Sequence, residues 1–332
     1  MWTETEGFRK DARCLFGMDN LLPIRREGFI FPYDPQARCV RGEMKMANAM
    51  KQVTTADIRK KKETGTPITM MTAYDYPSAK LVDEAGVDMI LVGDSLGMVV
   101  LGYDSTLPVT MEDMIHHTKA VTRAAKRAFV VADLPFLSYH GTLAEAVKNA
   151  GRLMQEGLAK AVKMEGGSEL APIITRCVQA GIPVVAHIGL TPQAVHQLGG
   201  YKVQGRSIEA AQKMLEEALV LEEAGAFAIV LECVPEEVTA MIASKLEIAV
   251  IGIGAGAQCD GQVLVFHDLV GYASQLAPKF VKRYAEVGDT IRDAVASYVK
   301  EVEERSFPAA EHVFHASEET IKQLYGEGVG QK

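Results

Sequence analysis

Eight short apolar runs alternate with amphipathic stretches along most of this chain, and this alternation restricts its possible folds more than any other feature. Each run has the length of a buried parallel strand. The runs are residues 68–74, 87–94, 129–133, 161–165, 183–187, 227–232, 248–252 and 263–266. The clearest helical stretches are residues 78–85, 111–126, 143–156, 169–180 and 208–224, four of which end near a glycine, at Gly86, Gly157, Gly181 or Gly225.

Eight strand–helix units are the number that closes a β/α barrel. A doubly wound sheet typically uses about five or six strands and often opens with a G-x-G-x-x-G turn, which is absent here. We therefore predict an α/β fold, a single (β/α)8 TIM barrel over residues 51–332. The barrel is preceded by a poorly ordered extension at residues 1–50 and followed by extra helices at residues 279–304 and 318–325.

The composition argues against several classes of protein. A formal net charge of −8 gives no basic surface for nucleic-acid phosphates. Five cysteines without C-x-x-C spacing favour neither a disulfide framework nor a cysteine zinc site. No apolar run has the roughly 18 residues needed to cross a bilayer, and no secretory signal is recognisable. We expect a cytoplasmic protein without membrane or nucleic-acid partners.

Ionisable residues stand at the ends of the first six predicted strands. In a β/α barrel these ends meet at one face, where the active site lies. Buried carboxylates side by side are costly unless a cation compensates, and oxygen ligands favour magnesium. Lys163 and Glu165, two residues apart on one strand, should point into the same mouth. The residues are Asp75, Asp94 with Ser95, Asp133, Lys163 with Glu165, His187 and Glu232.

The residues alone leave alternatives open. Asp75 or Asp133 would equally serve as a helix N-cap or turn former. Lys163 and Glu165 would also form a purely structural ion pair, and His187 a hydrogen-bonded core histidine. The glycine-rich run at 251–256 suits either an anion-binding loop or a tight turn with positive φ angles. Cys233 should face away from Glu232 as a structural thiol.

Nine short motifs occur in an order that resembles the ketopantoate hydroxymethyltransferase family of the phosphoenolpyruvate/pyruvate barrel superfamily. The resemblance extends from about residue 72 to residue 271 and through the SFP at 306–308. The motifs are TAYDY (72–76), VGDSLG (92–97), DSTLPVT (104–110), ADLPF (132–136), VKMEGG (162–167), HIGLTP (187–192), GGYKVQGR (199–206), LECVP (231–235) and IGIGAG (251–256).

The resemblance implies a role for each site residue. Asp94 and Asp133 would coordinate Mg²⁺, with Glu165 near the ion through a water. Glu232, which follows three apolar residues, would be the catalytic base. The substrate-binding residues would be Asp94, Ser95, Asp133, Lys163 and, on the folate side, His187.

The same resemblance implies the reaction and the assembly. The base would remove the C3 proton of 3-methyl-2-oxobutanoate, and the resulting enolate would attack a one-carbon unit from 5,10-methylenetetrahydrofolate to give 2-dehydropantoate. The assembly would be a homo-oligomer, a decamer in this family. The rivals are a metal-dependent lyase or phosphonomutase, which usually carries a reactive cysteine loop not found here, and a barrel that only binds a metabolite or partner.

Overall fold

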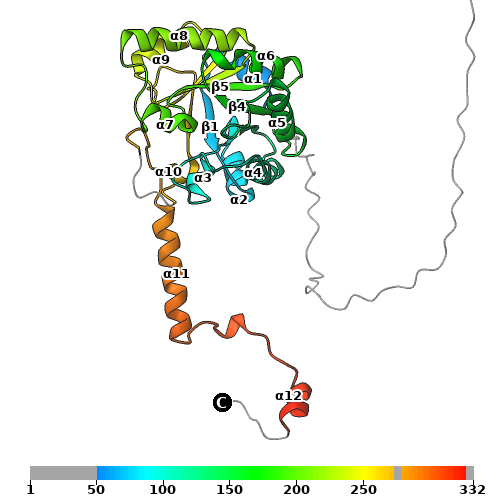
Figure 1. The fold of residues 1–332 in the computed structure, drawn as a ribbon. Coiled ribbons are helices and arrows are strands. Elements are labelled where there is room, and N and C mark those ends of the chain that lie inside the picture. The colour runs from blue at the N-terminus through cyan, green and yellow to red at the C-terminus, as the bar shows by residue number, and fades with distance from the viewer. Residues whose placement is uncertain (1–50, 273–277, 327–332) are drawn as a thin grey trace, which may run out of the picture. The chain divides into compact units, whose positions relative to one another are not determined.

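The eight predicted strands form a closed barrel in the computed structural model, which describes residues 51–272 and 278–326 (Figure 1). All neighbouring strands are parallel, and β8 pairs with β1 to close the barrel. The strands are β1 (Ile68–Thr72), β2 (Met89–Val92), β3 (Phe129–Asp133), β4 (Ala161–Glu165), β5 (Val184–Gly189), β6 (Ala228–Glu232), β7 (Ala249–Ile253) and β8 (Gly261–Leu264). The predicted TIM barrel is confirmed. The predicted extension at residues 1–50 lies outside the described residues.

Helices follow the strands and cover the outside of the barrel, where Figure 1 shows α2, α4, α5, α6 and α8 around the sheet. Apolar side chains of these helices pack against the outward-facing residues of the strands in one continuous core. The helices are α1 (Thr55–Glu63), α2 (Tyr76–Glu84), α3 (Leu96–Val99), α4 (Met111–Ala124), α5 (Leu143–Gln155), α6 (Ala171–Gln179), α7 (Val195–Leu198), α8 (Ile208–Glu223), α9 (Glu236–Ala243), α10 (Phe266–Leu269), α11 (Val287–Glu303) and α12 (Glu318–Tyr325), with 3-10 turns η1 (Ser168–Leu170), η2 (Pro192–Ala194) and η3 (Ala310–His312).

A second apolar core fills the inside of the barrel and explains the position of the polar residues. In β3 its members are Phe129 and Val131, which alternate with outward-facing residues. Because side chains on a strand alternate between the two faces, the next inward position of β3 is Asp133. The same step leads from Ala161 to Lys163 and Glu165 in β4. Apolar side chains thus fill the inside of the barrel toward the amino ends of the strands. At the carboxyl ends, the inward-facing positions are ionisable.

The same step holds in the next two strands. Val185 in β5 and Val230 in β6 belong to the inner core, and the residues two positions further on are His187 and Glu232. The inward face of four successive strands therefore changes from apolar to ionisable at one level of the barrel.

The segment 279–286 departs from the predicted helix 279–304, because α11 begins only at Val287. Phe280 packs against the inner barrel core, and a Cβ on Gly254 would lie 2.6 Å from its ring. Tyr284 N–H donates to Leu269 O at 2.8 Å. These contacts with distant parts of the chain stabilise a non-helical conformation of the segment. Tertiary packing here overrides the local helix propensity.

Helix ends follow the glycine pattern with one exception. Gly86, Gly181 and Gly225 take positive φ angles directly after α2, α6 and α8. After α5 the left-handed residue is instead Leu158, with φ of 63°. A Cβ on Gly157 would lie 2.5 Å from Leu153 O, so this glycine is required by close packing. The last strand also differs from prediction, since Phe266 begins α10 and does not end β8.

Candidate active site

Two aspartates from neighbouring strands meet at the carboxyl end of the barrel. Asp133 is the last residue of β3, and Asp94 follows β2 after Gly93. Asp133 Oδ2 accepts a hydrogen bond of 3.1 Å from the backbone N–H of Asp94. Both side chains are buried. The predicted convergence of strand ends therefore brings these two carboxylates together.

Lys163 is the buried cation of this cluster. Its Nζ lies 3.1 Å from Asp133 Oδ1 and 3.5 Å from Glu165 Oε1. The side chain is only 4% exposed. As predicted, Lys163 and Glu165 point into the same mouth, where they form an ion pair. This pair is part of a larger cluster and not an isolated structural salt bridge.

His187 in β5 connects this cluster to Glu232 at the end of β6. His187 Nδ1 lies 3.3 Å from Glu165 Oε1, to which it can donate, and 3.1 Å from Lys163 Nζ. His187 Nε2 lies 3.4 Å from Glu232 Oε2. The Glu232 side chain is 17% exposed and therefore reaches both the buried cluster and solvent.

The electrostatics of the cluster depend on mutual compensation. Burial, together with the charges of Glu165 and Asp133, raises the pKa of Asp94 well above its usual range. Burial also raises the pKa of Asp133, although Lys163 opposes the shift. Burial alone would raise the pKa of Glu165, but attraction to Lys163 and His187 outweighs it and lowers that pKa to about 2.

The two basic groups keep their protons for the complementary reason. Burial alone would lower the pKa of Lys163, but the attraction of Asp133, Glu165 and Asp94 outweighs it and raises the pKa above its usual range. For His187, burial and Lys163 lower the pKa, yet Glu165 and Glu232 raise it to about 9. The site therefore combines the protonated Lys163 with several buried carboxyl groups that lie around it.

Ser95 lies at the rim of the cluster. It occupies the N-cap position of α3 without a side-chain capping bond. Its Oγ lies 2.8 Å from the hydroxyl of Tyr74, which follows β1 and is fully buried. Ser95 thus follows Asp94 directly in the sequence, and its hydroxyl group is hydrogen-bonded to a residue that follows the neighbouring strand β1.

Two other site residues were missed in the sequence. Gln193 in η2 is buried, and its side-chain Nε2 donates to Asp94 Oδ2 at 2.8 Å. Its backbone N–H donates to Glu165 Oε2 at 3.0 Å. Tyr139, also buried, contacts both Gln193 and Glu165 through its hydroxyl. The only signal for Gln193 was its place directly after the HIGLTP motif, and Tyr139 gave none.

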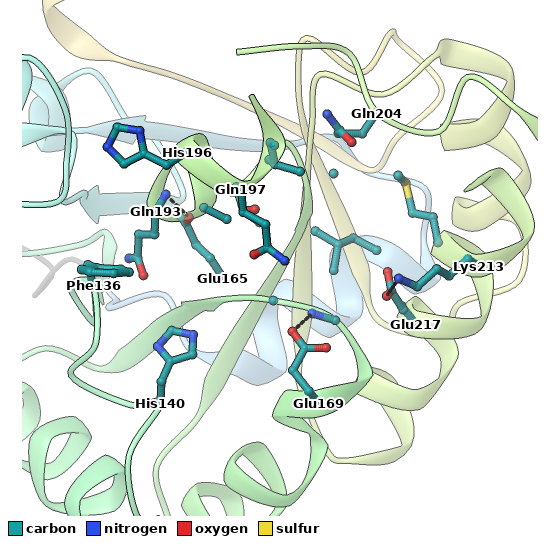
Figure 2. Close-up of a pocket in the computed structure, with 18 of the residues that line it drawn as sticks. Phe136, His140, Glu165, Glu169, Gln193, His196, Gln197, Gln204, Lys213 and Glu217 are labelled. Atoms are coloured by element: carbon teal, nitrogen blue, oxygen red, sulfur yellow. Dashed lines mark hydrogen bonds and ion pairs between the residues drawn. The ribbon is translucent and has the colours of Figure 1, made fainter. Parts of the chain in front are cut away.

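A cavity of about 1,010 Å³ opens beside the cluster. Glu165 and Gln193 line it at one side, and Lys213 and Glu217 of α8 line it at the other (Figure 2). Its wall also contains Phe136 and His140 from the segment after β3, Glu169 from η1, and His196, Gln197 and Gln204 from the segment after β5. The cavity therefore borders the carboxylate cluster and extends away from it toward the outer helix.

Other sequence-derived candidates have structural roles. Asp75 is the N-cap of α2, where its side chain accepts from Ser78 N–H at 2.8 Å, so the N-cap alternative is confirmed. In the 251–256 run, Gly254 and Gly256 take positive φ angles, and Ala257 N–H already donates to Glu236 Oε1 at 3.1 Å, which favours the tight turn. Burial raises the pKa of Cys233 to about 11, which fits an inert thiol.

The residues present fit a magnesium ion held by few protein ligands. Among the described residues, no three His, Cys, Asp or Glu side chains are arranged to hold one metal ion as they stand. Magnesium usually takes only one or two protein carboxylates, with waters and substrate oxygens completing its shell. Asp133 Oδ1 is buried and makes no hydrogen bond, its partner being the Lys163 ammonium group at 3.1 Å, and Asp94 lies beside it. Asp94 and Asp133 therefore form a suitable two-carboxylate donor set.

Comparison with known proteins decides the family. The family model for ketopantoate hydroxymethyltransferase matches residues 52–310. The chain belongs to this family. The 3-methyl-2-oxobutanoate hydroxymethyltransferase of Carboxydothermus hydrogenoformans is 55% identical over 276 residues, which cover 83% of this chain and all of the relative. The same enzyme of Geobacillus kaustophilus is 60% identical over 265 residues, 80% of this chain and 95% of the relative.

This ketopantoate hydroxymethyltransferase-family chain is therefore an enzyme, a transferase of one-carbon units. Solved structures agree on the fold. A phosphonopyruvate hydrolase, 16% identical, matches with a TM-score of 0.51 over 83% of this chain and 95% of its own. A 2,3-dimethylmalate lyase of the PEP mutase/isocitrate lyase superfamily, 14% identical, matches with a TM-score of 0.52 over 82% and 92%. In the described part of the chain, no helix is long and apolar enough to span a membrane.

Proposed function

We propose that this chain transfers a hydroxymethyl group from 5,10-methylenetetrahydrofolate to 3-methyl-2-oxobutanoate, giving 2-dehydropantoate for the synthesis of pantothenate and coenzyme A. The observation that carries the proposal is the unbroken set of contacts from Asp94 and Asp133 through Lys163 and His187 to Glu232. It lies where β/α-barrel enzymes bind their substrates. The names of the relatives supply the acceptor substrate.

Asp94 and Asp133 would hold Mg²⁺, and Glu165 would approach the ion through a water. When bound, the ion supplies positive charge that polarises the ketone of the oxo acid. Lys163 adds a second positive charge at the same place, since its ammonium group lies 3.1 Å from Asp133. Ser95 and His187 complete the set of substrate-binding residues that we assign. Stabilised charge on the ketone oxygen makes the C3 proton easier to remove.

Glu232 is the proposed base. Its carboxylate stands at the end of an inward row and is partly exposed, so it can take the C3 proton and later release it to water. His187 Nε2 lies 3.4 Å from this carboxylate, an ion-pair distance without a hydrogen bond. The resulting enolate forms a bond from C3 to the one-carbon unit. Water supplies the hydroxyl oxygen on the same carbon, and both C–N bonds that joined it to the folate break. The proton taken from C3 and one proton of the water are balanced by the two protons that end on the folate nitrogens.

The cavity beside Glu165 is the proposed site of the folate donor. Its volume of about 1,010 Å³ suits a large ligand, since pockets for drug-sized molecules span about 300–1,000 Å³. It borders the carboxylate cluster, which a donor must approach to reach the enolate. At its outer side Lys213 Nζ lies 3.4 Å from Glu217 Oε1, and this ammonium group suits the carboxylate tail of a folate.

The donor site is tested by changing Lys213→Ala. We expect the KM for methylenetetrahydrofolate to rise about 2- to 5-fold, because an exposed ion pair contributes at most about 1 kcal/mol. Exchange of the C3 proton in the absence of folate should not change. The matched control is Lys80→Ala in α2, which removes a similar exposed pair with Glu84 far along the chain. An unchanged donor KM in Lys213→Ala would contradict this placement.

The overall reaction is tested by mass spectrometry of the products. The purified chain, 3-methyl-2-oxobutanoate, magnesium and methylenetetrahydrofolate should together yield 2-dehydropantoate, and omission of the donor should abolish it. Absence of product with the complete mixture, from a chain that binds the oxo acid, would refute the proposed function and favour a binding barrel.

A homo-oligomer, a decamer by family resemblance, is also proposed. Helix α11 supports this proposal, because none of its residues is buried against the described part of the chain. Its apolar side chains recur at helical spacing and are exposed. They are Ile291, Val295, Tyr298, Val299 and Val302. A second copy of this chain is the proposed occupant of this stripe.

A further inference from the structure

Gln193, in the short turn η2, makes several hydrogen bonds at the carboxylate cluster. Its side-chain Nε2 donates to Asp94 Oδ2 at 2.8 Å and to Leu134 O at 2.9 Å. Its Oε1 accepts from the Tyr139 hydroxyl at 2.7 Å. An amide has two N–H donors. Both are used here, and the residue is buried.

The backbone of the same residue holds a second carboxylate. Gln193 N–H donates to Glu165 Oε2 at 3.0 Å. Glu165 is further fixed by Tyr139, whose hydroxyl accepts from Glu165 N–H at 3.0 Å. Asp94 follows β2 and Glu165 ends β4, so β3 separates the two carboxylates in the barrel. Gln193 therefore connects two acidic groups that the sheet itself does not bring into contact.

The surroundings also fix which way the amide group points. The backbone oxygen of Leu134 can only accept hydrogen bonds, so it must face Nε2. Asp94 Oδ2 lies 2.8 Å from the same nitrogen. Oε1 then faces the Tyr139 hydroxyl, which can donate. A glutamate at this position would place an acceptor against two acceptors. These partners require an amide at position 193. They also exclude the flipped amide, in which Oε1 and Nε2 would exchange places.

We propose that Gln193, supported by Tyr139, is a positioning residue that sets the orientation of the Asp94 and Glu165 carboxylates toward the metal ion and the oxo acid. This inference rests on the proposed function, since it concerns the same site. Gln193 also lines the cavity assigned to the donor, where Figure 2 shows it beside Glu165. It therefore stands in the wall between the two substrates. Partners that orient metal ligands typically affect metal affinity about 10- to 100-fold.

The test is Gln193→Met, which keeps the length of the side chain and the backbone N–H to Glu165 but removes both donors. Calorimetry should show Mg²⁺ affinity, measured with the oxo acid present, weakened about 10- to 100-fold. The KM for the oxo acid should rise more than kcat falls. The matched control is Gln197→Met, because Gln197 lines the same cavity and no contact of it with the carboxylates is found among the described residues. This control should retain wild-type Mg²⁺ affinity.

Tyr139→Phe gives a second, independent variant if Gln193→Met does not fold. It removes the hydroxyl that holds Gln193 Oε1, so it should weaken Mg²⁺ binding in the same direction by a smaller factor. A double-mutant cycle of Gln193→Met with Asp94→Asn, measured by urea unfolding without metal, should be non-additive if the two side chains are coupled.

Wild-type Mg²⁺ affinity in folded Gln193→Met, or additive effects in the cycle, would overturn the inference. Failure of the proposed function looks different. In that case the wild-type chain itself shows no metal-dependent exchange of the C3 proton, whatever residue stands at position 193.

Discussion

At the scale of single residues, the charge of each buried group in the site depends on the charged groups that lie next to it. Lys163 in β4 keeps its ammonium charge because Asp133 of β3 lies 3.1 Å away. Glu165 remains ionised because Lys163 and His187 outweigh the effect of burial on its pKa. Glu232 differs from these groups, because its partly exposed carboxylate lies at the edge of the cluster. This position suits a group that must move a proton between substrate and water.

Replacement of that base should remove proton abstraction while sparing binding. We expect Glu232→Gln to slow exchange of the C3 proton at least 100-fold, since general-base catalysis typically contributes about 10²–10⁴-fold. Binding of the oxo acid and Mg²⁺, followed by calorimetry, should stay close to wild type. Glu237→Gln is the matched control, because Glu237 is an exposed residue of α9 in the same segment. Wild-type exchange in Glu232→Gln would remove this residue as the base.

At the scale of elements, the amino ends of the strands are held by a separate ionic network, opposite the site. Asp88, just before β2, is buried and accepts from Lys61 of α1 at 2.8 Å and from Thr69 N–H of β1 at 2.9 Å. Arg127, just before β3, lies 3.2 Å from its other oxygen. One carboxylate thus joins a helix and the starts of three strands. Residues at this end of a barrel contribute to stability.

Asp88→Asn should therefore destabilise the fold by about 1–3 kcal/mol in urea unfolding at pH 7, a value that allows for the partial exposure of Lys61 and Arg127. Although burial alone would raise the pKa of Asp88, hydrogen bonds from Lys61 and Thr69 lower it below its usual 3.8. A lowered folded-state pKa means that this stability is present above pH 3.8 and is lost as the pH falls through the folded value.

The difference between wild type and Asp88→Asn should therefore be largest near neutral pH and shrink in acid. Asp293→Asn in α11 is the control, since its carboxylate is exposed and makes no contact found among the described residues. A difference that is constant with pH would contradict the assigned ion pairs.

The sequence predicted the elements better than their boundaries. Apolar runs located all eight strands, because buried parallel strands need continuous apolar residues on both faces. The ionisable residues at five of the six strand ends do lie together, but Asp75, at the end of the first strand, caps α2 instead. Gln193 and Tyr139 were missed because their contacts join β2, β4 and the turn after β5, and no local pattern encodes such distances. The segment 279–286 was wrongly predicted as helix. Its conformation is set by contacts of Phe280 and Tyr284 with residues distant in the sequence.

At the scale of the whole molecule, the stripe of exposed apolar residues on α11 bears on assembly. We expect sedimentation equilibrium to give a mass well above the 36.0 kDa of one chain. Val295→Glu should reduce that mass, because a charge in a buried apolar contact is costly. Ser297→Glu lies on the opposite side of the same helix and should not reduce it. A wild-type mass of one chain would contradict the proposed oligomer.

The most direct measurement is proton NMR of 3-methyl-2-oxobutanoate in deuterated water with the wild-type chain, with magnesium and then with a chelator, before any folate is added. The proposed mechanism predicts loss of the C3 proton signal that depends on the metal and precedes transfer. A C3 signal that persists in the presence of magnesium, with the oxo acid bound, would contradict enolate formation at this site.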